Sequence, residues 1–212
     1  MSQHDLFSPL NLSIDPTMAN LLPYDGIVQD YGVIFGQDDA DAYFDALYDG
    51  IDWQHDVVKL YGKTVTTARQ VAWYGDDGVQ YRYSGSTRTA LPWSELLLKL
   101  KTNIEAHLAA IHPISFNACL LNLYHDGSQG MGWHSDDEPE LGQMPIIASL
   151  SLGATRKFVL RHKSSKQKIE LSLAHGQLIV MHGSTQRYWQ HALMKTTKVQ
   201  QPRINLTFRQ ML

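Results

Sequence analysis

The chain has 212 residues, 43% of them hydrophobic, which is enough for one domain with a full core. Its net charge of −3 argues mildly against a protein that holds nucleic acid by overall charge alone. No apolar run could span a bilayer, and the polar N-terminus is unlike a signal peptide. A single cysteine excludes a disulfide framework. We therefore expect a cytoplasmic protein, or a nuclear one in a eukaryote.

Two helices are predicted in the N-terminal half, after an irregular and peripheral segment at residues 1–24. Residues 39–48 carry apolar side chains at helical spacing behind an acidic start. Residues 92–111 show a longer pattern of the same kind, and its buried side is predicted to hold Trp93, Leu96, Leu97, Leu100, Ile104, Leu108 and Ile111. Between the two helices, residues 57–86 have the pattern of short strands and turns, which fits a substrate lid.

Strands dominate from Phe116 to the C-terminus. The segment 202–209 alternates strictly, with Arg203, Asn205, Thr207 and Arg209 on one face and apolar residues on the other. The segment 117–124 alternates in the same way, and Cys119 belongs to its apolar interior. A strand with one apolar face and an arginine-bearing opposite face implies a polar cavity inside the protein.

These elements predict an α+β fold that is mainly β. We expect a double-stranded β-helix, or jelly roll, at residues 116–212, buttressed by the N-terminal helices. Residues 25–212 would form one domain, in which residues 57–90 make a substrate-recognition lid.

Two closely spaced polar residues indicate a metal site. In an extended strand, residues i and i+2 share a face, so His134 and Asp136 can hold one ion together. A second histidine would complete the two-histidine, one-carboxylate triad of non-haem Fe(II) oxygenases. We prefer His191, which lies in an extended apolar stretch leading to the arginine strand, and His182 remains the alternative.

The strand at 202–209 supplies a side chain that can bind the co-substrate of such an iron site. A guanidinium group binds a carboxylate through two parallel hydrogen bonds, so Arg203 is suited to the distal carboxylate of 2-oxoglutarate. The predicted cofactors are therefore Fe(II), 2-oxoglutarate as co-substrate, and O2.

Many ordered blocks of the sequence resemble the AlkB family of nucleic-acid repair dioxygenases, particularly its duplex-DNA branch. The resemblance runs from about Leu60 to Leu212. It rests on Tyr-Gly-Asp at 74–76, Tyr-Arg-Tyr-Ser-Gly at 81–85, Asn-Leu-Tyr at 122–124, His-Ser-Asp-Asp-Glu at 134–138, Phe-Val-Leu-Arg-His-Lys at 158–163, Leu-Ala-His-Gly at 173–176, Trp-Gln-His at 189–191 and Pro-Arg-Ile-Asn-Leu-Thr-Phe-Arg at 202–209.

The resemblance implies a role for each matching residue. The iron ligands, which are also the catalytic residues, would be His134, Asp136 and His191. The shell around 2-oxoglutarate would be Asn122, Tyr124, Arg203, Asn205 and Arg209. The pocket for the substrate base would be lined by Tyr81, Tyr83, Ser84, Asp137, Glu138 and Arg161.

The resemblance also places Tyr61 where the duplex-specific branch carries an aromatic wedge that fills the gap left by a flipped base. A phenol is more polar than a phenyl ring and desolvates less readily, so a preference for single strands stays open. Flipping itself is required, because an enzyme reaches the ring atoms of a base only outside the stack.

The implied function is oxidative demethylation of N-alkylated bases, of the 1-methyladenine and 3-methylcytosine type, with release of formaldehyde. The expected partner is alkylated DNA, with RNA as the alternative; we expect a monomer and no membrane. The alternative functions are the same iron chemistry on RNA or a protein side chain, and binding of damaged bases without turnover. Six basic residues between Arg156 and Lys168 form either a backbone-tracking hairpin or a solvated turn.

Overall fold

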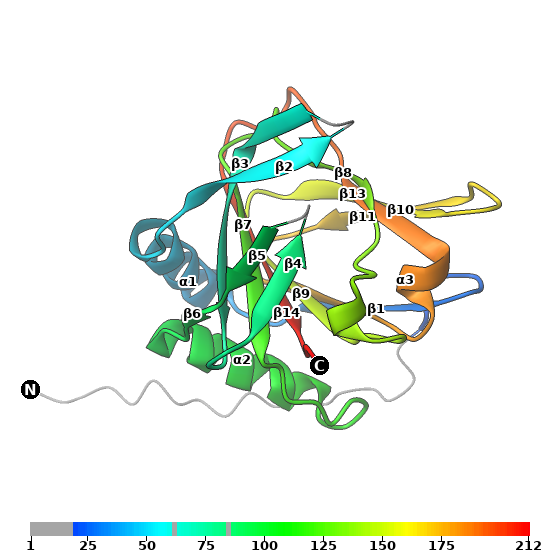
Figure 1. Ribbon diagram of the computed structural model, residues 1–212, viewed down its shortest axis with the longest axis horizontal. Coiled ribbons are helices and arrows are strands. Elements are labelled where there is room, and N and C mark those ends of the chain that lie inside the picture. The colour runs from blue at the N-terminus through cyan, green and yellow to red at the C-terminus, as the bar shows by residue number, and fades with distance from the viewer. Residues whose placement is uncertain (1–18, 61–62, 84–85) are drawn as a thin grey trace, which may run out of the picture.

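The described residues form two packed sheets with two helices on one outer side (Figure 1). The computed structural model describes residues 19–60, 63–83 and 86–212. The larger sheet runs in the order β1-β12-β9-β14-β7-β3-β2, with β6 beside β3. Its strands are β1 (Ile27–Val33), β12 (Gln177–His182), β9 (Ile147–Gly153), β14 (Arg203–Arg209), β7 (Ala118–Tyr124), β3 (Lys63–Gly75), β2 (Gln54–Leu60) and β6 (Leu91–Pro92).

The smaller sheet faces the larger one and runs in the order β11-β10-β13-β8. Its strands are β11 (Lys168–Leu173), β10 (Arg156–His162), β13 (Trp189–Leu193) and β8 (Met131–His134). A separate hairpin pairs β4 (Gln80–Tyr83) with β5 (Ser86–Thr89). Short helical turns lie at η1 (Pro139–Leu141) and α3 (Thr185–Tyr188). Two facing sheets of this kind are the expected jelly roll.

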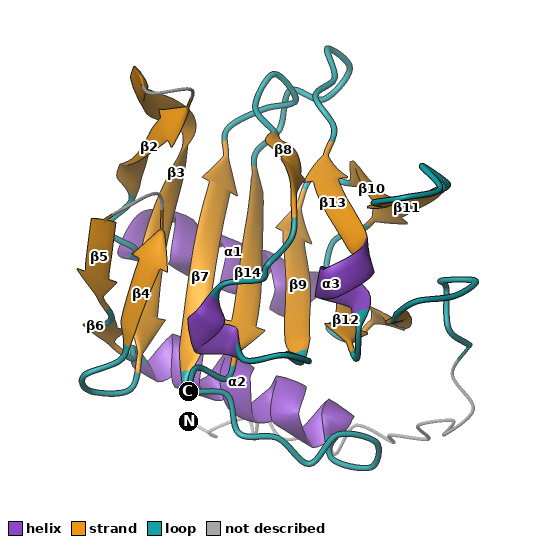
Figure 2. Cartoon of the chain, turned by 45° about the vertical axis from the view of Figure 1, so that its right-hand side comes forward, coloured by secondary structure: helices purple, strands orange, loops and turns teal. Residues whose placement is uncertain are grey.

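Helices α1 (Gln37–Gly50) and α2 (Glu95–Leu108) cover the outer face of the larger sheet (Figure 2). The apolar stripe of α2 is Leu97, Leu100, Ile104 and Leu108, which are all buried. These residues recur every three or four positions, so one side of the helix carries the whole contact. The helices therefore buttress the sheet as predicted.

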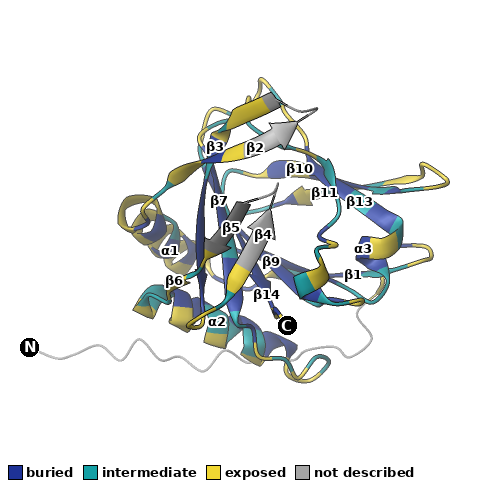
Figure 3. Ribbon diagram, viewed as in Figure 1, coloured by how far each residue is buried: buried dark blue, intermediate teal, exposed yellow. Residues whose placement is uncertain are grey.

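The alternation within the central strands separates a core face from a cavity face. In β14, Ile204, Leu206 and Phe208 join the helices in the main core. Arg203 and Arg209 point to the other side, between the two sheets, and both are nevertheless buried. Figure 3 shows that the central strands are buried while exposed residues gather on the helices and on the hairpin at β2 and β3. The polar face predicted from the sequence is thus an internal one.

Two elements differ from their predicted bounds. Helix α2 begins at Glu95 because Ser94 caps it, accepting a hydrogen bond from the backbone N–H of Leu97 at 3.3 Å, and it ends at Leu108 rather than Ile111. The region expected to hold only short strands contains β3, which has 13 residues and pairs with β7 in the larger sheet. None of the helices in the described part of the chain is long and apolar enough to cross a membrane.

Candidate active site

The three predicted metal ligands converge between the two sheets. His134 ends β8 and pairs in register with His191 of β13, while Asp136 follows two residues after the strand. Asp136 carboxylate oxygens lie 3.8 Å from Nε2 of His134 and 3.9 Å from Nε2 of His191. One ligand atom from each residue falls within 4.8 Å of the others. Three such atoms can face a single ion, and two histidines with one carboxylate suit Fe(II).

The protonation state of these ligands also suits a metal ion, which requires deprotonated ligands. Burial and the neighbouring His134 lower the pKa of His191 to about 3, so its imidazole is neutral at pH 7. Burial alone would raise the pKa of Asp136, but the charge of Arg209 and the two histidines hold it below its ordinary value. The site therefore presents a neutral imidazole at His191 and a carboxylate at Asp136.

Backbone and side-chain contacts orient the ligands. Nδ1 of His134 lies 2.8 Å from the carbonyl oxygen of Gly132, so it carries the proton and leaves Nε2 free to bind a metal. The side chain of Gln186 accepts a hydrogen bond from the backbone N–H of Asp136 at 2.9 Å. Arg209 donates to the Asp136 carboxylate from 3.1 Å, and both side chains are buried. Gln186 thereby holds the backbone of Asp136, and Arg209 holds its carboxylate.

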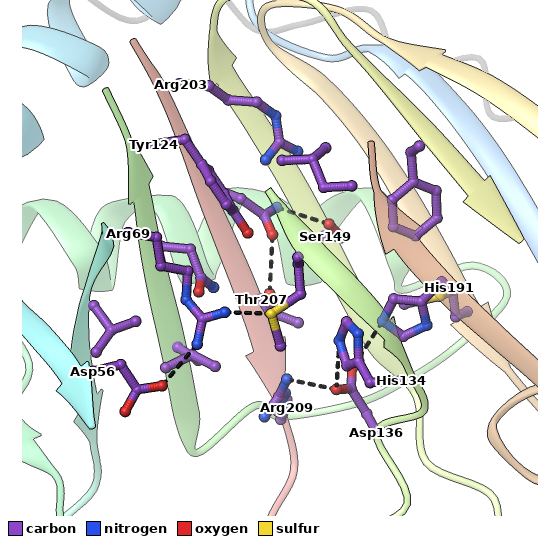
Figure 4. A pocket seen from close by; sticks show the side chains of 18 of the residues that line it. Asp56, Arg69, Tyr124, His134, Asp136, Ser149, His191, Arg203, Thr207 and Arg209 are labelled. Carbon is purple, nitrogen blue, oxygen red and sulfur yellow. Dashed lines mark hydrogen bonds and ion pairs between the residues drawn. The ribbon is translucent and has the colours of Figure 1, made fainter. Parts of the chain in front are cut away.

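A second polar group lies at the other end of the cavity, as Figure 4 shows. Arg203 donates from Nη2 to Ser151 Oγ at 2.9 Å, and its guanidinium carbon lies 5.7 Å from the ring centre of Tyr124. No carboxylate of the described residues pairs with this guanidinium, and its Nε has no hydrogen-bond partner among them. A buried cation in this state requires an anion that the protein does not itself supply.

The cavity between the two ends is about 860 Å³, including the solvent at its mouth. Its wall combines the triad with the amides of Asn122 and Asn205 and with apolar side chains. Asn205 is held by Ser149 Oγ at 2.9 Å and by the Leu150 carbonyl at 3.0 Å. The cavity therefore offers ligands for a metal ion at one end and a guanidinium for an anion at the other.

A buried ion pair closes the side of the cavity toward β2 and β3. Arg69 donates to Asp56 at 2.8 Å, and its other terminal nitrogen contacts the sulfur of Met131. Figure 4 shows this pair beside the cavity, on the side away from His191. The pair links the edge of the larger sheet to β8, the strand that carries His134.

Loss of one partner of this ion pair should destabilise the protein strongly. We expect Asp56→Ala to lower the free energy of unfolding by about 3–5 kcal/mol, because Arg69 stays buried without its carboxylate. Urea denaturation of the variant measures this change. The double variant Asp56→Ala/Arg69→Met should lose less, and equal losses in the two proteins would contradict the explanation.

His182, the alternative ligand, lies away from the metal ligands. Its Nε2 is 3.1 Å from the Gln29 side-chain oxygen, and its ring centre is 4.3 Å from that of His112. The cluster of ligand atoms contains His191 and not His182. Burial and His112 lower the pKa of His182 to about 4.

This lowered pKa predicts how stability depends on pH. The unfolded chain protonates His182 below its ordinary pKa of 6.5, whereas the folded protein resists protonation down to about pH 4. The unfolded state therefore binds more protons in this window, and the free energy of unfolding falls as pH drops from 6.5 toward 4. His182→Asn should flatten this slope in urea titrations at several pH values. An unchanged slope would show that another group is responsible.

The predicted base-pocket residues are not brought together by the described part of the structure. Tyr61 and Ser84 lie outside the described residues, and so do the side chains of Tyr81 and Tyr83, whose backbone belongs to β4. Asp137 is exposed, 3.5 Å from Nζ of Lys163, and Glu138 is partly buried.

Arg161 lies on the outer face of the smaller sheet, whereas His191 points from the inner face into the cavity. Its guanidinium is stacked 4.1 Å from the ring centre of Trp133 and donates to Gln190 at 3.0 Å. The cavity lining contains neither Arg161 nor Asp137 nor Glu138. Their part in binding a base therefore stays a prediction.

Some residues that line the cavity, or contact its lining as Ser151 does, escaped the sequence analysis. They are the serines of β9, the ion pair on β2 and β3, and several apolar side chains: Asp56, Arg69, Val71, Trp73, Met131, Ser149, Ser151 and Phe158. One signal was present for the serines, since residues 148–152 alternate small polar and apolar side chains as β14 does.

Comparisons with known proteins agree with this geometry. The model of the 2OG-Fe(II) oxygenase superfamily matches residues 31–209. The human protein "DNA oxidative demethylase ALKBH2" is 38% identical over 199 residues, which cover 89% of this chain and 75% of the human one. The bovine "Alpha-ketoglutarate-dependent dioxygenase alkB homolog 3" is 40% identical over 181 residues, covering 81% and 61% of the two chains.

The fold is also similar to a solved structure. The structure of OsALKBH1 superposes with a TM-score of 0.60 at 18% identity, over 89% of this chain and 98% of that one. At this identity the likeness concerns the fold alone.

Proposed function

Given that this chain belongs to the 2OG-Fe(II) oxygenase superfamily, we propose that it removes N-alkyl groups from damaged DNA bases. It is a dioxygenase whose cofactors are Fe(II), 2-oxoglutarate and O2. The observation that supports DNA as the substrate is the 38% identity, along 89% of the chain, to a human DNA oxidative demethylase. The lesions we expect are 1-methyladenine and 3-methylcytosine.

The iron would be held by His134, Asp136 and His191, whose ligand atoms already face one another. When bound, Fe(II) with 2-oxoglutarate and O2 supplies the oxidising power that hydroxylates the N-methyl group, after which formaldehyde is released. Arg209 keeps Asp136 ionised and oriented by donating to its carboxylate. The hydrogen bond from Nδ1 of His134 to the Gly132 carbonyl orients the ring so that Nε2 is the nitrogen that would bind the metal.

The other end of the cavity would hold 2-oxoglutarate. Arg203 would pair with the distal carboxylate. This carboxylate would supply the negative charge that the buried guanidinium lacks among the described residues. Tyr124, Asn122 and Asn205 line the space between Arg203 and the triad. Tyr124 and Asn122 can donate hydrogen bonds to the co-substrate, whereas the amide N–H groups of Asn205 already donate to β9. This arrangement orients the co-substrate before the damaged base arrives.

The damaged base would bind on the open side of the iron, in a pocket formed by Tyr81, Tyr83, Ser84, Asp137, Glu138 and Arg161. A base methylated at a ring nitrogen is cationic, so the carboxylates directly after Asp136 favour it electrostatically. Tyr61 would fill the gap left in the stack. Residues 57–90 would act as the nucleotide-recognition lid.

We further propose that the protein works as a monomer, in the cytoplasm or, in a eukaryote, in the nucleus. Size-exclusion chromatography with light scattering tests the oligomeric state. A dimer that persists on dilution would contradict it.

The central experiment incubates a 1-methyladenine oligonucleotide with the protein, Fe(II), 2-oxoglutarate and air, and follows the oligonucleotide by mass spectrometry. We expect loss of one methylene unit (CH2), dependent on 2-oxoglutarate. Succinate formation without this loss would contradict the DNA assignment and direct the search to RNA or protein substrates. Offering the oligonucleotide as a single strand and as a duplex, to the wild type and to Tyr61→Ala, tests the wedge.

A further inference from the structure

Arg156 is a buried cation that the mechanism above does not use. It begins β10 in the basic segment 156–168, yet its side chain is only 1% exposed, so it does not belong to a surface hairpin. Because strand residues alternate, it shares the inner face of the smaller sheet with Phe158, which lines the active-site cavity. Its neighbour Lys157, in contrast, is exposed and paired with Glu170.

The guanidinium of Arg156 joins two loops at the same end of the cavity as Arg203. Nη1 donates to the carbonyl of Asp126 at 3.0 Å, and Nη2 donates to those of Gln129 at 2.6 Å and Met194 at 2.9 Å. The first loop follows Tyr124, and the second follows the strand that carries His191. These acceptors are all neutral carbonyls. The nearest compensating charge is the carboxylate of Asp126, which acts on Arg156 through space without forming an ion pair with it.

Tyr124 lies close to both buried cations. The guanidinium carbon of Arg156 is 6.0 Å from the Tyr124 ring centre, and that of Arg203 is 5.7 Å from it. Neither guanidinium has a carboxylate partner within the described part of the chain, and each has an Nε without a hydrogen bond there. Burial first, and the charge of Arg156 in addition, lower the pKa of Arg203 to about 10. Two like charges thus repel across one aromatic ring.

We propose that Arg156 is a positioning residue for 2-oxoglutarate, which strengthens binding of the distal carboxylate by adding a second buried charge behind Tyr124. The co-substrate is a dianion, and its distal carboxylate at Arg203 relieves the repulsion between the two guanidinium groups. The hydrogen bonds to the two loops hold Arg156 in place for this role. The proposal rests on the superfamily's co-substrate and not on the identity of the alkylated substrate.

The size of the effect follows from the charge alone. At a separation of about 10 Å and an effective dielectric constant of about 20, one unit charge changes the affinity for a singly charged carboxylate about tenfold. The effect should be specific for ligands that carry the distal carboxylate. A ligand of the same chain length without it should not respond to Arg156.

The experiment measures binding rather than turnover. Calorimetry under anaerobic conditions, on protein loaded with Fe(II), compares 2-oxoglutarate with 2-oxopentanoate, in which a methyl group replaces the distal carboxylate; displacement titration serves for the weaker ligand. For Arg156→Met we expect the Kd for 2-oxoglutarate to rise about tenfold and that for 2-oxopentanoate to stay unchanged. Arg156→Lys keeps the charge and should bind 2-oxoglutarate nearly as the wild type does. Should Arg156→Met fail to fold, Arg156→Gln, whose amide still donates to carbonyls, makes the same comparison.

Gly127→Ala is the matched control for the loops. Gly127 exchanges backbone hydrogen bonds of 2.8 Å with Thr196 and Val199, and a Cβ at Gly127 would collide with the Thr196 carbonyl. This variant disturbs the same junction without removing a charge, so it should affect both ligands alike. If Arg156→Met also weakened both ligands alike, or weakened neither, the proposal would be overturned. A wild-type protein that bound no 2-oxoglutarate would overturn it too, together with the superfamily's co-substrate.

Discussion

Replacement of His134 by alanine should abolish 2-oxoglutarate turnover and iron retention while leaving the fold intact. The remaining pair, Asp136 and His191, lacks the third ligand that holds a metal in the facial arrangement. The side chain of His134 is 28% exposed and donates a hydrogen bond to the backbone carbonyl of Gly132, so its loss should disturb packing little. Succinate production, iron content per protein and thermal unfolding measure the three parts of this result.

His182→Asn is the matched control, because it removes a half-buried histidine that touches none of the ligands. This variant should retain iron and turnover. Substantial turnover dependent on 2-oxoglutarate in pure His134→Ala would refute the triad. Loss of iron in His182→Asn with retention in His191→Ala would move the third ligand to His182.

The parts of the site that depend on local alternation could be predicted from the sequence. A strand places every second residue on one face, so Arg203, Asn205 and Arg209 had to share a surface wherever β14 lay in the sheet. The same rule puts Asn122 and Tyr124 on one face of β7. Short-range periodicity is sufficient for such predictions because no partner strand has to be known in advance.

The parts that depend on pairing between distant segments could not be predicted. Asp56 and Arg69 become partners only through the register of β2 with β3, which is shifted by an irregularity between His55 and Val57. Arg156 was grouped with surface lysines because a basic residue in a basic segment carries no local sign of burial. Only the loops that it joins, from 126–129 and 194, explain its position.

The charges of the cavity explain why a dianion belongs there. Asp136 faces Arg209, and Asp56 faces Arg69, so these two pairs are internally balanced. Among the described residues, Arg203 forms no ion pair, and Arg156 has only the carboxylate of Asp126 nearby, which it does not contact. The protein therefore keeps a buried excess of positive charge at the end of the cavity away from the triad, and this excess opposes folding until an anion enters.

Replacement of Arg203 by methionine should accordingly separate affinity from stability. We expect the KM for 2-oxoglutarate to rise about a hundredfold or more, because truncating one partner of a buried, hydrogen-bonded charge pair costs about 2–5 kcal/mol. The free energy of unfolding without co-substrate should stay unchanged or increase, since an apolar side chain of similar volume replaces a desolvated cation. Initial rates over a range of 2-oxoglutarate concentrations, and urea denaturation without it, measure the two effects.

The opposite signs distinguish a ligand-binding arginine from a structural one. A guanidinium that mainly stabilised the fold through Ser151 and Tyr124 would lose stability and affinity together on replacement. Stabilisation by 2-oxoglutarate should also be largely absent in Arg203→Met, because a ligand stabilises only in proportion to its binding. If the variant were destabilised and still gained stability from 2-oxoglutarate as the wild type does, the distal carboxylate would have to bind elsewhere in the cavity.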